Sequence, residues 1–223
     1  IFQIAKWKKL NAKQKKRLAA LPIVIDAGNG MIGVLLKKFL KQAGIRAEVL
    51  FERVDCRFPN HEANPVKAAT LKTLMKRIVK IKAAFGVAFD GDADRLGVVD
   101  ERGERVPGDL VGALIATELL ATATPAVRRS TLILGDTNAG WAFKEQVESI
   151  GAKFKIVPVG HANIKAKMRE TEALFAAELS YHFYYRDFYN VESTLLSLLF
   201  LIRSMLTDEV TLAEKLKPLR KYF

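Results

Sequence analysis

Three aspartates alternate with small residues near the middle of the chain, and an arginine follows the last of them. The stretch reads Asp90-Gly91-Asp92-Ala93-Asp94-Arg95. Side chains at every second position of an extended segment point to the same side, so the three carboxylates are expected to converge. Three anions at one place repel one another unless a cation lies between them, and carboxylate oxygens suit a hard cation such as Mg²⁺. We therefore predict a magnesium site at Asp90, Asp92 and Asp94, with Arg95 facing an anion that the metal recruits.

The segments on either side of this loop help to decide what kind of cation site it is. Short apolar runs with β-branched residues lie before the loop, at 83–89, and after it, at 96–99, which predicts two strands. An EF-hand loop would also place acidic residues at these spacings, with Glu101 at its twelfth position. That loop needs flanking helices and a glycine where this chain has Arg95. The pattern favours a loop between strands over an EF-hand, and a solvated acidic turn is a third interpretation.

The composition indicates a globular chain with unevenly distributed charge. Half of the 223 residues are hydrophobic, enough for a sizeable core, and no apolar run approaches the ~20 residues of a membrane span. The single cysteine, Cys56, excludes an intrachain disulfide and, with no signal peptide pattern, predicts a cytoplasmic location. Seven cations and no acid lie in residues 1–20, so the other residues carry +5 of the formal net charge of +12. We interpret 1–20 as a basic helix or linker, expect neither a membrane nor nucleic acid as a partner, and note that +5 suits an anionic small substrate.

Strand and helix patterns alternate along the first half of the chain. Apolar runs at 23–26 and 47–51 flank a glycine-rich turn and a helical pattern at 31–43. This β-α-β pattern favours a parallel sheet. A basic amphipathic helix is predicted at 68–82, before the two strands around the acidic loop.

A similar pattern repeats in the second half. Strands are predicted at 131–134, 153–159 and 174–178, and helices at 108–120, 141–150 and 193–205. Residues 122–129 are predicted to form a loop. The fold class that follows is α/β, with two similar three-layer domains and mixed, mostly parallel sheets, at 21–104 and 105–223.

A glycine motif gives a competing interpretation of function. Gly28, Gly30 and Gly33 spell G-x-G-x-x-G between a strand and a helix. Glu48 and Glu52 lie about twenty residues further on, as in dinucleotide-binding domains. Asp26, however, would lie near a bound pyrophosphate, and the motif does not explain the three aspartates. A tight turn that needs small residues only for packing is the alternative.

Taken together and in order, five motifs resemble the α-D-phosphohexomutase family, in particular its phosphomannomutase/phosphoglucomutase branch. The motifs are Asp26-Ala27-Gly28-Asn29-Gly30, Phe58-Pro59-Asn60-His61, the acidic loop 90–95, Gly160-His161 with Lys165, and Glu178-Leu179-Ser180. The resemblance covers nearly the whole chain. Enzymes of this family have four domains and move a phosphate between the two ends of a hexose through a phosphoserine and a bisphosphate intermediate. This chain resembles only the second and third domains, so the resemblance implies that the first and fourth are missing partners.

The resemblance also implies a role for each candidate residue. Asp90, Asp92 and Asp94 would hold Mg²⁺, and Arg95 would steady the phosphate. A hexose phosphate, derived from mannose or glucose, would be the substrate. The residues implied to act on it are Glu178, Ser180 and Lys165 for binding and His161 and His182 for proton transfer.

Three departures from the family pattern limit these expectations. No T-A-S-H-N-P-like serine loop is present in the sequence, so the nucleophile is absent and the chain alone is predicted to be inactive. The two glycines of the usual G-E-x-S-G-H loop are replaced by Ala177 and Tyr181, and the tyrosine is expected to crowd the sugar or to force a different turn. A lysine common in the family is replaced in the loop that contains Asn138, which is expected to weaken substrate binding. A non-catalytic sugar-phosphate-binding remnant is therefore the alternative function.

Overall fold

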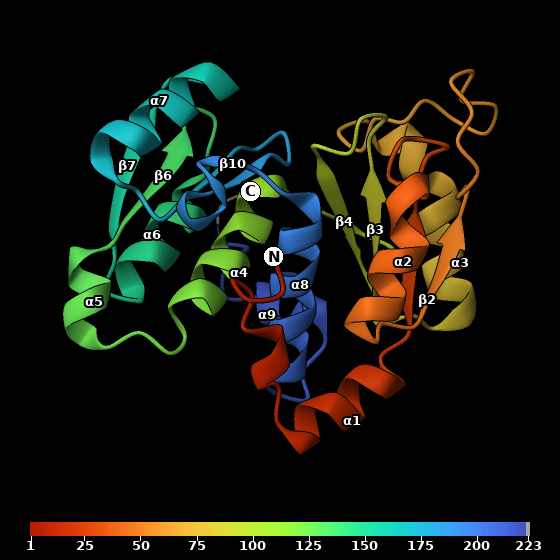
Figure 1. Ribbon diagram of the computed structural model, residues 1–223, viewed down its shortest axis with the longest axis horizontal. Coiled ribbons are helices and arrows are strands. Elements are labelled where there is room, and N and C mark those ends of the chain that lie inside the picture. The colour runs from red at the N-terminus through yellow and green to blue at the C-terminus, as the bar shows by residue number, and fades with distance from the viewer. Residues whose placement is uncertain (222–223) are drawn as a thin grey trace.

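The computed structural model describes residues 1–221 and contains two five-stranded sheets with helices on both faces (Figure 1). The first sheet has the strand order β2-β1-β3-β4-β5. Its strands are β1 (Ile23–Asp26), β2 (Ala47–Leu50), β3 (Phe85–Phe89), β4 (Leu96–Asp100) and β5 (Arg105–Val106). β1 is parallel to β2 and β3, whereas β4 is antiparallel to both of its neighbours. Four of the five strands therefore point in one direction, and β5 extends this sheet two residues past the predicted boundary at 104.

The second sheet repeats the same order, β7-β6-β8-β9-β10, with the same parallel and antiparallel pairs. Its strands are β6 (Leu132–Asp136), β7 (Lys153–Val157), β8 (Phe175–Ala177), β9 (Phe183–Tyr185) and β10 (Val191–Glu192). The two units are thus two copies of one topology. The predicted fold class, two similar three-layer α/β units, is confirmed.

Alternating side chains on the strands explain the layers. In β1, Val24 faces helix α3 (Lys72–Ile81), while Ile23 and Ile25 face helix α2 (Gly33–Ala43) on the other side of the sheet. The second sheet is covered in the same way by α7 (His161–Thr171) on one face and α6 (Trp141–Ser149) on the other. A 3-10 turn, η2 (Ala68–Leu71), leads directly into α3, so the predicted helix at 68–82 begins as a tighter turn.

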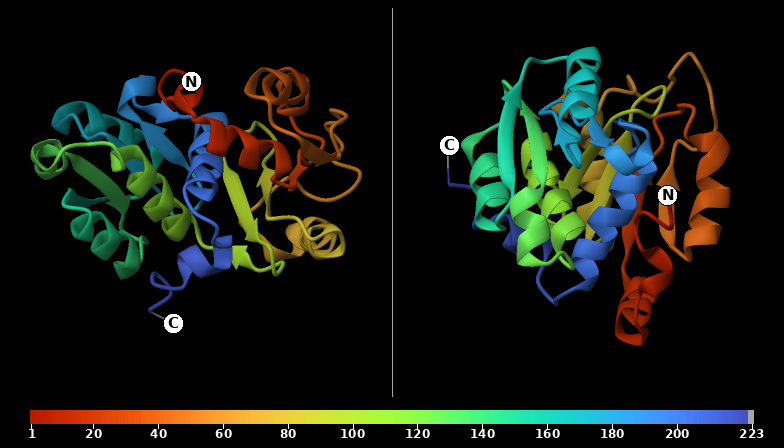
Figure 2. Two further views of the ribbon diagram at one scale, coloured as in Figure 1. Left: turned by 90° about the horizontal axis from the view of Figure 1, so that it is seen from below. Right: turned by 60° about the vertical axis from the view of Figure 1, so that its left-hand side comes forward.

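Two apolar helices lie between the sheets and join the units through one core. They are α4 (Gly108–Leu120), which has the predicted bounds, and α8 (Thr194–Leu206). Most residues of both helices are buried, on every side. Figures 1 and 2 show α8 beside β4 of the first sheet, and the same buried cluster contains side chains from both sheets.

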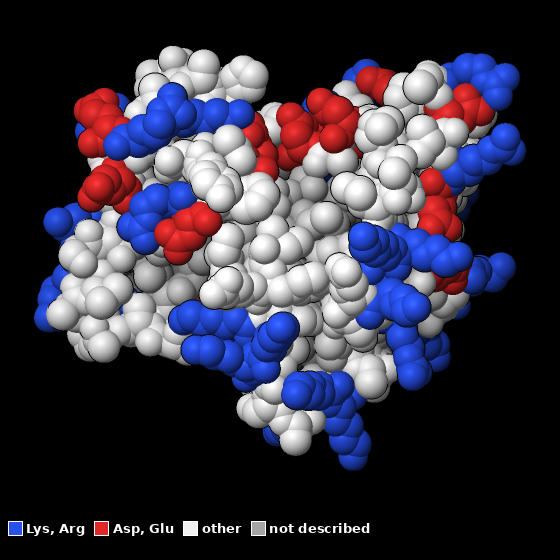
Figure 3. Space-filling view, viewed as in Figure 1, with Lys and Arg blue, Asp and Glu red and all other residues white. Residues whose placement is uncertain are grey.

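The basic N-terminal segment forms two short helices on the outside of this core. They are η1 (Trp7–Lys9) and α1 (Ala12–Ala20), and Asn11 caps α1 through a reciprocal pair of hydrogen bonds with Gln14. Trp7, Leu10 and Leu18 are buried, whereas the lysines are exposed. Figure 3 shows Lys and Arg side chains over α1 and α2, and Asp and Glu side chains at the top between the two units.

One predicted loop is a helix. Residues 122–129 were expected to lack regular structure, but α5 (Pro125–Ser130) begins there, because Thr124 caps it and Pro125 occupies its first turn. The remaining elements are η3 (Arg186–Phe188) and α9 (Leu212–Leu216). Among the described residues, every helix is too short or too polar to cross a lipid bilayer.

Candidate functional site

The structure brings the three aspartates of the acidic loop together. β3 ends at Phe89, so Asp90 is the first residue beyond the strand, and its side chain is buried. Its two carboxylate oxygens accept hydrogen bonds from Arg95, at 3.1 Å from the backbone nitrogen and 2.6 Å from Nε. One carboxylate oxygen of each of Asp90, Asp92 and Asp94 lies within 4.8 Å of the others. The predicted convergence is therefore present, but the loop bends at 91–93 and Ala93 has φ 67°, so it is not the extended segment that the prediction assumed.

The pKa of Asp94 reflects the crowding of these three carboxylates. Burial and the neighbouring Asp90 raise the pKa of Asp94 to about 6. Carboxylates crowded together in this way disfavour one another's charged forms. A divalent cation among them would reverse that effect, so the donor set and its charge fit Mg²⁺.

The glycine motif packs directly against the backbone of the acidic loop. A side chain on Gly30 would meet the carbonyl oxygens of Asp90 and Gly91, at 2.8 and 2.9 Å, and one on Gly33 would collide with the carbonyl of Glu52. The backbone nitrogen of Met31 also donates to the Gly91 carbonyl at 2.9 Å. Backbone from other segments fills the space beside these glycines. The packing interpretation of the motif therefore accounts for them without a dinucleotide.

His61 lies next to the same turn and pairs with Asp26. The buried Asp26 carboxylate accepts from the Gly28 nitrogen at 2.8 Å and lies 3.0 Å from Nε2 of His61. The other ring nitrogen of His61 is 2.8 Å from the Glu62 carbonyl. Only the charged imidazolium can donate at both nitrogens, and the hydrogen bond with Asp26 raises the pKa of His61 above its ordinary value of 6.5.

The substitution His61→Gln is expected to lower the free energy of unfolding by about 1 kcal/mol at pH 6 and by less at higher pH. A histidine whose pKa is raised on folding contributes its full stabilisation below its unfolded pKa and loses it as pH rises through the folded pKa. Urea unfolding between pH 5.5 and 9 measures the difference. His161→Gln, at an exposed site, is the control and is expected to give no such trend. A difference that grows with pH would contradict the ion pair.

The second loop, after β8, holds a buried carboxylate at the corresponding position. Glu178 accepts hydrogen bonds from the Gly160 nitrogen at 3.2 Å (Oε1) and from the Tyr184 hydroxyl at 3.0 Å (Oε2), and Nδ1 of His182 lies 2.8 Å from Oε2. Burial by itself would raise the pKa of Glu178, but the donors from His182, Gly160 and Tyr184 outweigh it and lower that pKa. Glu178 is therefore held as an ionised acceptor.

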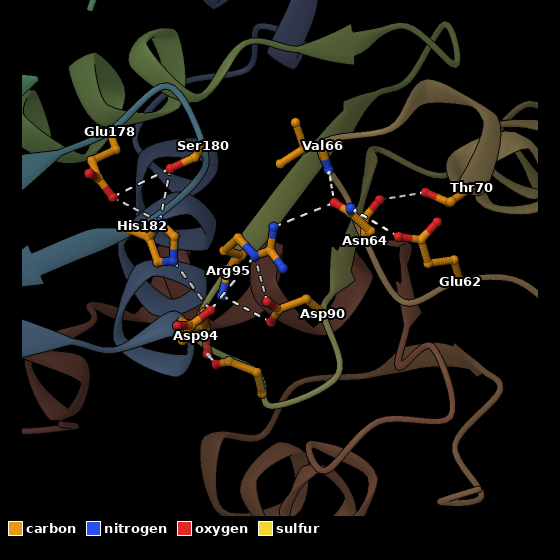
Figure 4. Close-up of polar contacts among 12 residues, drawn as sticks. Glu62, Asn64, Val66, Thr70, Asp90, Asp94, Arg95, Glu178, Ser180 and His182 are labelled. Carbon is orange, nitrogen blue, oxygen red and sulfur yellow. Dashed lines mark hydrogen bonds and ion pairs between the residues drawn. The ribbon is translucent and has the colours of Figure 1, made fainter. Parts of the chain in front are cut away.

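His182 connects the two loops, as Figure 4 shows. Its Nε2 lies 3.4 Å from Oδ1 of Asp94, and its Nδ1 lies 2.9 Å from the Ser180 hydroxyl as well as close to Glu178. Burial disfavours the charged imidazole, but Glu178 and Asp94 outweigh it and raise the pKa of His182. A second link is the Thr194 hydroxyl, which donates to the Ala93 carbonyl at 2.8 Å. The aspartate loop and the Glu178 loop thus form one site.

The two residues that replace glycines in the second loop do not enter this site. Tyr181 adopts a left-handed backbone conformation, with φ 74°, and its buried side chain donates to the Val106 carbonyl at 2.9 Å. Its own carbonyl accepts from Leu96 at 3.2 Å. Ala177 packs against Gly112 of α4, where a second methyl group would not fit. The expectation that Tyr181 crowds the sugar is therefore wrong, because its ring lies in the core between the sheets.

Two other predicted residues lie at the edge of the site. His161 is exposed at the first turn of α7, directly after Gly160. Lys165 forms an ion pair with Glu192 at 2.7 Å and lies over the ring of Tyr184, 5.9 Å from its centre. Tyr184 and Glu192 were not predicted as site residues. The only sequence signal for Tyr184 was its place in an aromatic stretch, where strand alternation gives neighbouring residues opposite faces.

Comparisons with known proteins assign the chain to a family. The sequence models of phosphoglucomutase/phosphomannomutase alpha/beta/alpha domain II and domain III match residues 2–103 and 107–222. The chain belongs to the phosphoglucomutase/phosphomannomutase family. Both loops of the candidate site lie within the matched residues, one in each domain.

Individual relatives agree with this assignment. A phosphomannomutase from Methanocaldococcus jannaschii is 34% identical over 215 residues, which is 96% of this chain and 45% of that protein. A phosphomannomutase/phosphoglucomutase from Pseudomonas putida is 34% identical over 75% of this chain and 35% of its own length. The crystal structure of a phosphoglucomutase/phosphomannomutase family protein from Burkholderia thailandensis superposes with a TM-score of 0.83 and 28% identity, covering 99% of this chain and 47% of that one. The chain thus spans less than half of each.

Proposed function

We propose that this chain supplies the metal-binding and sugar-binding halves of a hexose-phosphate mutase site, which moves a phosphate between the 1- and 6-positions of mannose or glucose. The contact of Asp94 with His182, and of His182 with Glu178, carries the proposal. Through these two contacts, His182 joins the proposed cation-binding loop, which contains Asp94, to the proposed hydroxyl-binding loop, which contains Glu178. A phosphorylated sugar needs both kinds of group side by side.

Asp90, Asp92 and Asp94 would hold Mg²⁺. The support is their converging oxygens and the raised pKa of Asp94. When bound, the ion would offset negative charge on a phosphoryl group. Arg95 is kept beside the site by Asp90 and has further guanidinium N–H groups with which to steady a phosphate.

Glu178 and Ser180 would bind sugar hydroxyls. The ionised Glu178 accepts, and the Ser180 hydroxyl both donates and accepts. His182, between the two loops, and His161, at the rim, are proposed to move protons. Lys165, given a substrate-binding role by the resemblance, is already paired with Glu192.

The phosphoserine nucleophile would come from outside this chain. The relatives are more than twice as long as the stretch that matches, and the first and fourth domains of the family are the proposed partners. Such an enzyme acts on cytoplasmic sugar phosphates, which is the proposed location. The chain alone is expected to bind Mg²⁺ but to turn over little or no substrate.

A coupled assay for glucose 6-phosphate tests this expectation. The chain is given glucose 1-phosphate, glucose 1,6-bisphosphate and Mg²⁺, with a four-domain mutase as the positive control. The expected rate is indistinguishable from that without protein, because the sequence holds no T-A-S-H-N-P-like serine loop to carry the phosphoryl group. Robust turnover by the isolated chain would contradict the proposal.

A non-catalytic sugar-phosphate-binding role is the second candidate. Asn138, in the loop where the family commonly has a lysine, favours it, since a cation that would contact the substrate is absent. Titration with hexose phosphates after the other family domains are restored separates the candidates. Catalysis then supports the mutase, whereas binding without catalysis supports the second role.

A further inference from the structure

A buried tyrosine donates a hydrogen bond to the Glu178 carboxylate. The Tyr184 hydroxyl donates to Oε2 of Glu178 at 3.0 Å, and the Tyr184 side chain is fully buried between the second sheet and α7. Burial and Glu178 both raise the pKa of this phenol, so it stays protonated and remains a donor. The Gly160 nitrogen binds the other oxygen of the same carboxylate. Oε1 thus has one fixed donor and an acceptor position left for groups in the site, whereas Oε2 accepts from Tyr184 and also lies 2.8 Å from Nδ1 of His182.

An ion pair fixes the ring of Tyr184. Glu192 lies directly opposite Tyr184 in the pairing of β9 with β10, and it holds the Lys165 ammonium at 2.7 Å. The ammonium lies 5.9 Å from the centre of the Tyr184 ring, close enough for a cation–π contact. Both charged side chains are partly buried, which shields the pair from solvent. Lys165 is therefore engaged by Glu192 and by the ring of Tyr184.

We propose that Tyr184 is a positioning residue for Glu178, with the Lys165–Glu192 ion pair holding its ring so that the carboxylate keeps the orientation that accepts sugar hydroxyls. The proposal rests on the proposed sugar-binding function of Glu178. It gives Lys165 a role that acts through Tyr184 and involves no contact with the substrate. It also gives a role to Glu192, on the last strand of the sheet.

Two neighbouring tyrosines allow a matched test. Tyr184→Phe removes the hydroxyl that faces Glu178, and Tyr185→Phe removes an equally buried hydroxyl that faces Ser197, at 2.7 Å, on the opposite side of the strand. Titration of the chain with glucose 1-phosphate in the presence of Mg²⁺ is followed by nuclear magnetic resonance. Tyr184→Phe is expected to weaken binding about tenfold, since it removes a hydrogen bond to a charged group. Tyr185→Phe is expected to stay within twofold of the unchanged chain.

A second signal reports the position of Glu178 without any ligand. The backbone amide of Gly160 donates to Glu178, so its resonance is expected to move in Tyr184→Phe and to stay in place in Tyr185→Phe. An unmoved Gly160 resonance in Tyr184→Phe would overturn the proposal, as would sugar affinity within twofold of the unchanged chain. If the unchanged chain binds no sugar phosphate even with the other family domains restored, the proposed function fails, and the Gly160 resonance still decides whether Tyr184 positions Glu178.

Lysine variants separate positioning from direct contact. Lys165→Met keeps most of the side-chain volume and removes the charge, and it is expected to weaken binding about threefold, less than Tyr184→Phe. Lys165→Arg is expected to recover the affinity, because it restores the ion pair with Glu192. Lys167→Met, which removes a pair with Glu170 on the same helix, is the control and is expected to have no effect. A loss from Lys165→Met that exceeds the loss from Tyr184→Phe would show that Lys165 touches the substrate, and would overturn the assignment.

Discussion

The double substitution Asp92→Asn/Asp94→Asn is expected to weaken Mg²⁺ binding roughly 100-fold, or about tenfold for each charge removed. Asp90 alone would remain, and both of its oxygens already accept hydrogen bonds from Arg95. Isothermal titration of the chain with MgCl₂ measures the change. The control Asp187→Asn/Glu209→Gln removes two exposed carboxylates elsewhere and is expected to leave Mg²⁺ affinity unaltered.

The same loop is expected to affect the melting temperature, and the direction of the effect depends on whether Mg²⁺ is present. Without metal, Asp92→Asn is expected to raise the melting temperature, because Asp92 is an exposed neighbour of Asp90 and Asp94 and its charge repels theirs. With saturating Mg²⁺ the order reverses, since the unchanged chain gains more from the ion. Mg²⁺ binding of unaltered strength in the double variant would rule out the aspartate site. An Asp92→Asn variant that is less stable without metal would rule out repulsion at this position.

Loss of the Arg203 guanidinium is expected to lower the free energy of unfolding by about 3 kcal/mol, for Arg203→Met at pH 7. Its Nε and one terminal nitrogen each lie 2.9 Å from Oε1 of Glu118, and both side chains are nearly buried between α4 and α8. Burial raises the pKa of Glu118 even with Arg203 beside it. Removing the arginine would leave a buried carboxylate without its cation. The guanidinium also donates to the Ala5 carbonyl, which ties the N-terminal segment to this core.

Urea unfolding of three variants tests the pair. Arg203→Met/Glu118→Met is expected to recover most of the stability, because it removes both charges and fills the space with apolar atoms. The penalty of Arg203→Met alone is expected to shrink as pH falls, since the orphaned Glu118 takes up a proton. Arg46→Met, at an exposed site, is the control. A single variant within 1 kcal/mol of the unchanged chain, or a double variant no more stable than the single one, would contradict a buried pair.

Local sequence patterns were enough to predict most elements. The helix at 108–120 has its predicted bounds, and the strands around the acidic loop differ from prediction by only a few residues. Helix α5 was missed because it is short and polar, although Thr124 followed by Pro125 is a helix start signal. The convergence of Asp90, Asp92 and Asp94 was predicted from their spacing, but the bend at 91–93, with Ala93 at φ 67°, was not.

Contacts between distant segments could not be predicted in this way. His182 meets Asp94 because α8 and α4 hold two sheets together, and no pattern in either loop encodes that packing. Lys165 was assigned to the substrate because it follows Gly160 and His161. Its partner Glu192 lies 27 residues later and is brought to it by β10. Tyr181 was expected to crowd the sugar or to force a different turn, because its loop sequence does not reveal that the side chain turns toward Val106.

The shared core has a mechanical consequence for the two loops. Because α4 and α8 are buried on both sides, a hinge between the sheets would expose apolar surface and break the backbone bond from Leu96 to Tyr181. The spacing between the proposed cation and sugar sites is therefore set by the packing of α4 and α8, which includes the buried Glu118–Arg203 ion pair. A change in helix packing, such as Ser197 to a larger residue, would alter that spacing without touching the ligands of either. Any opening and closing that a substrate requires would have to take place around this pair of domains, which would move as one body.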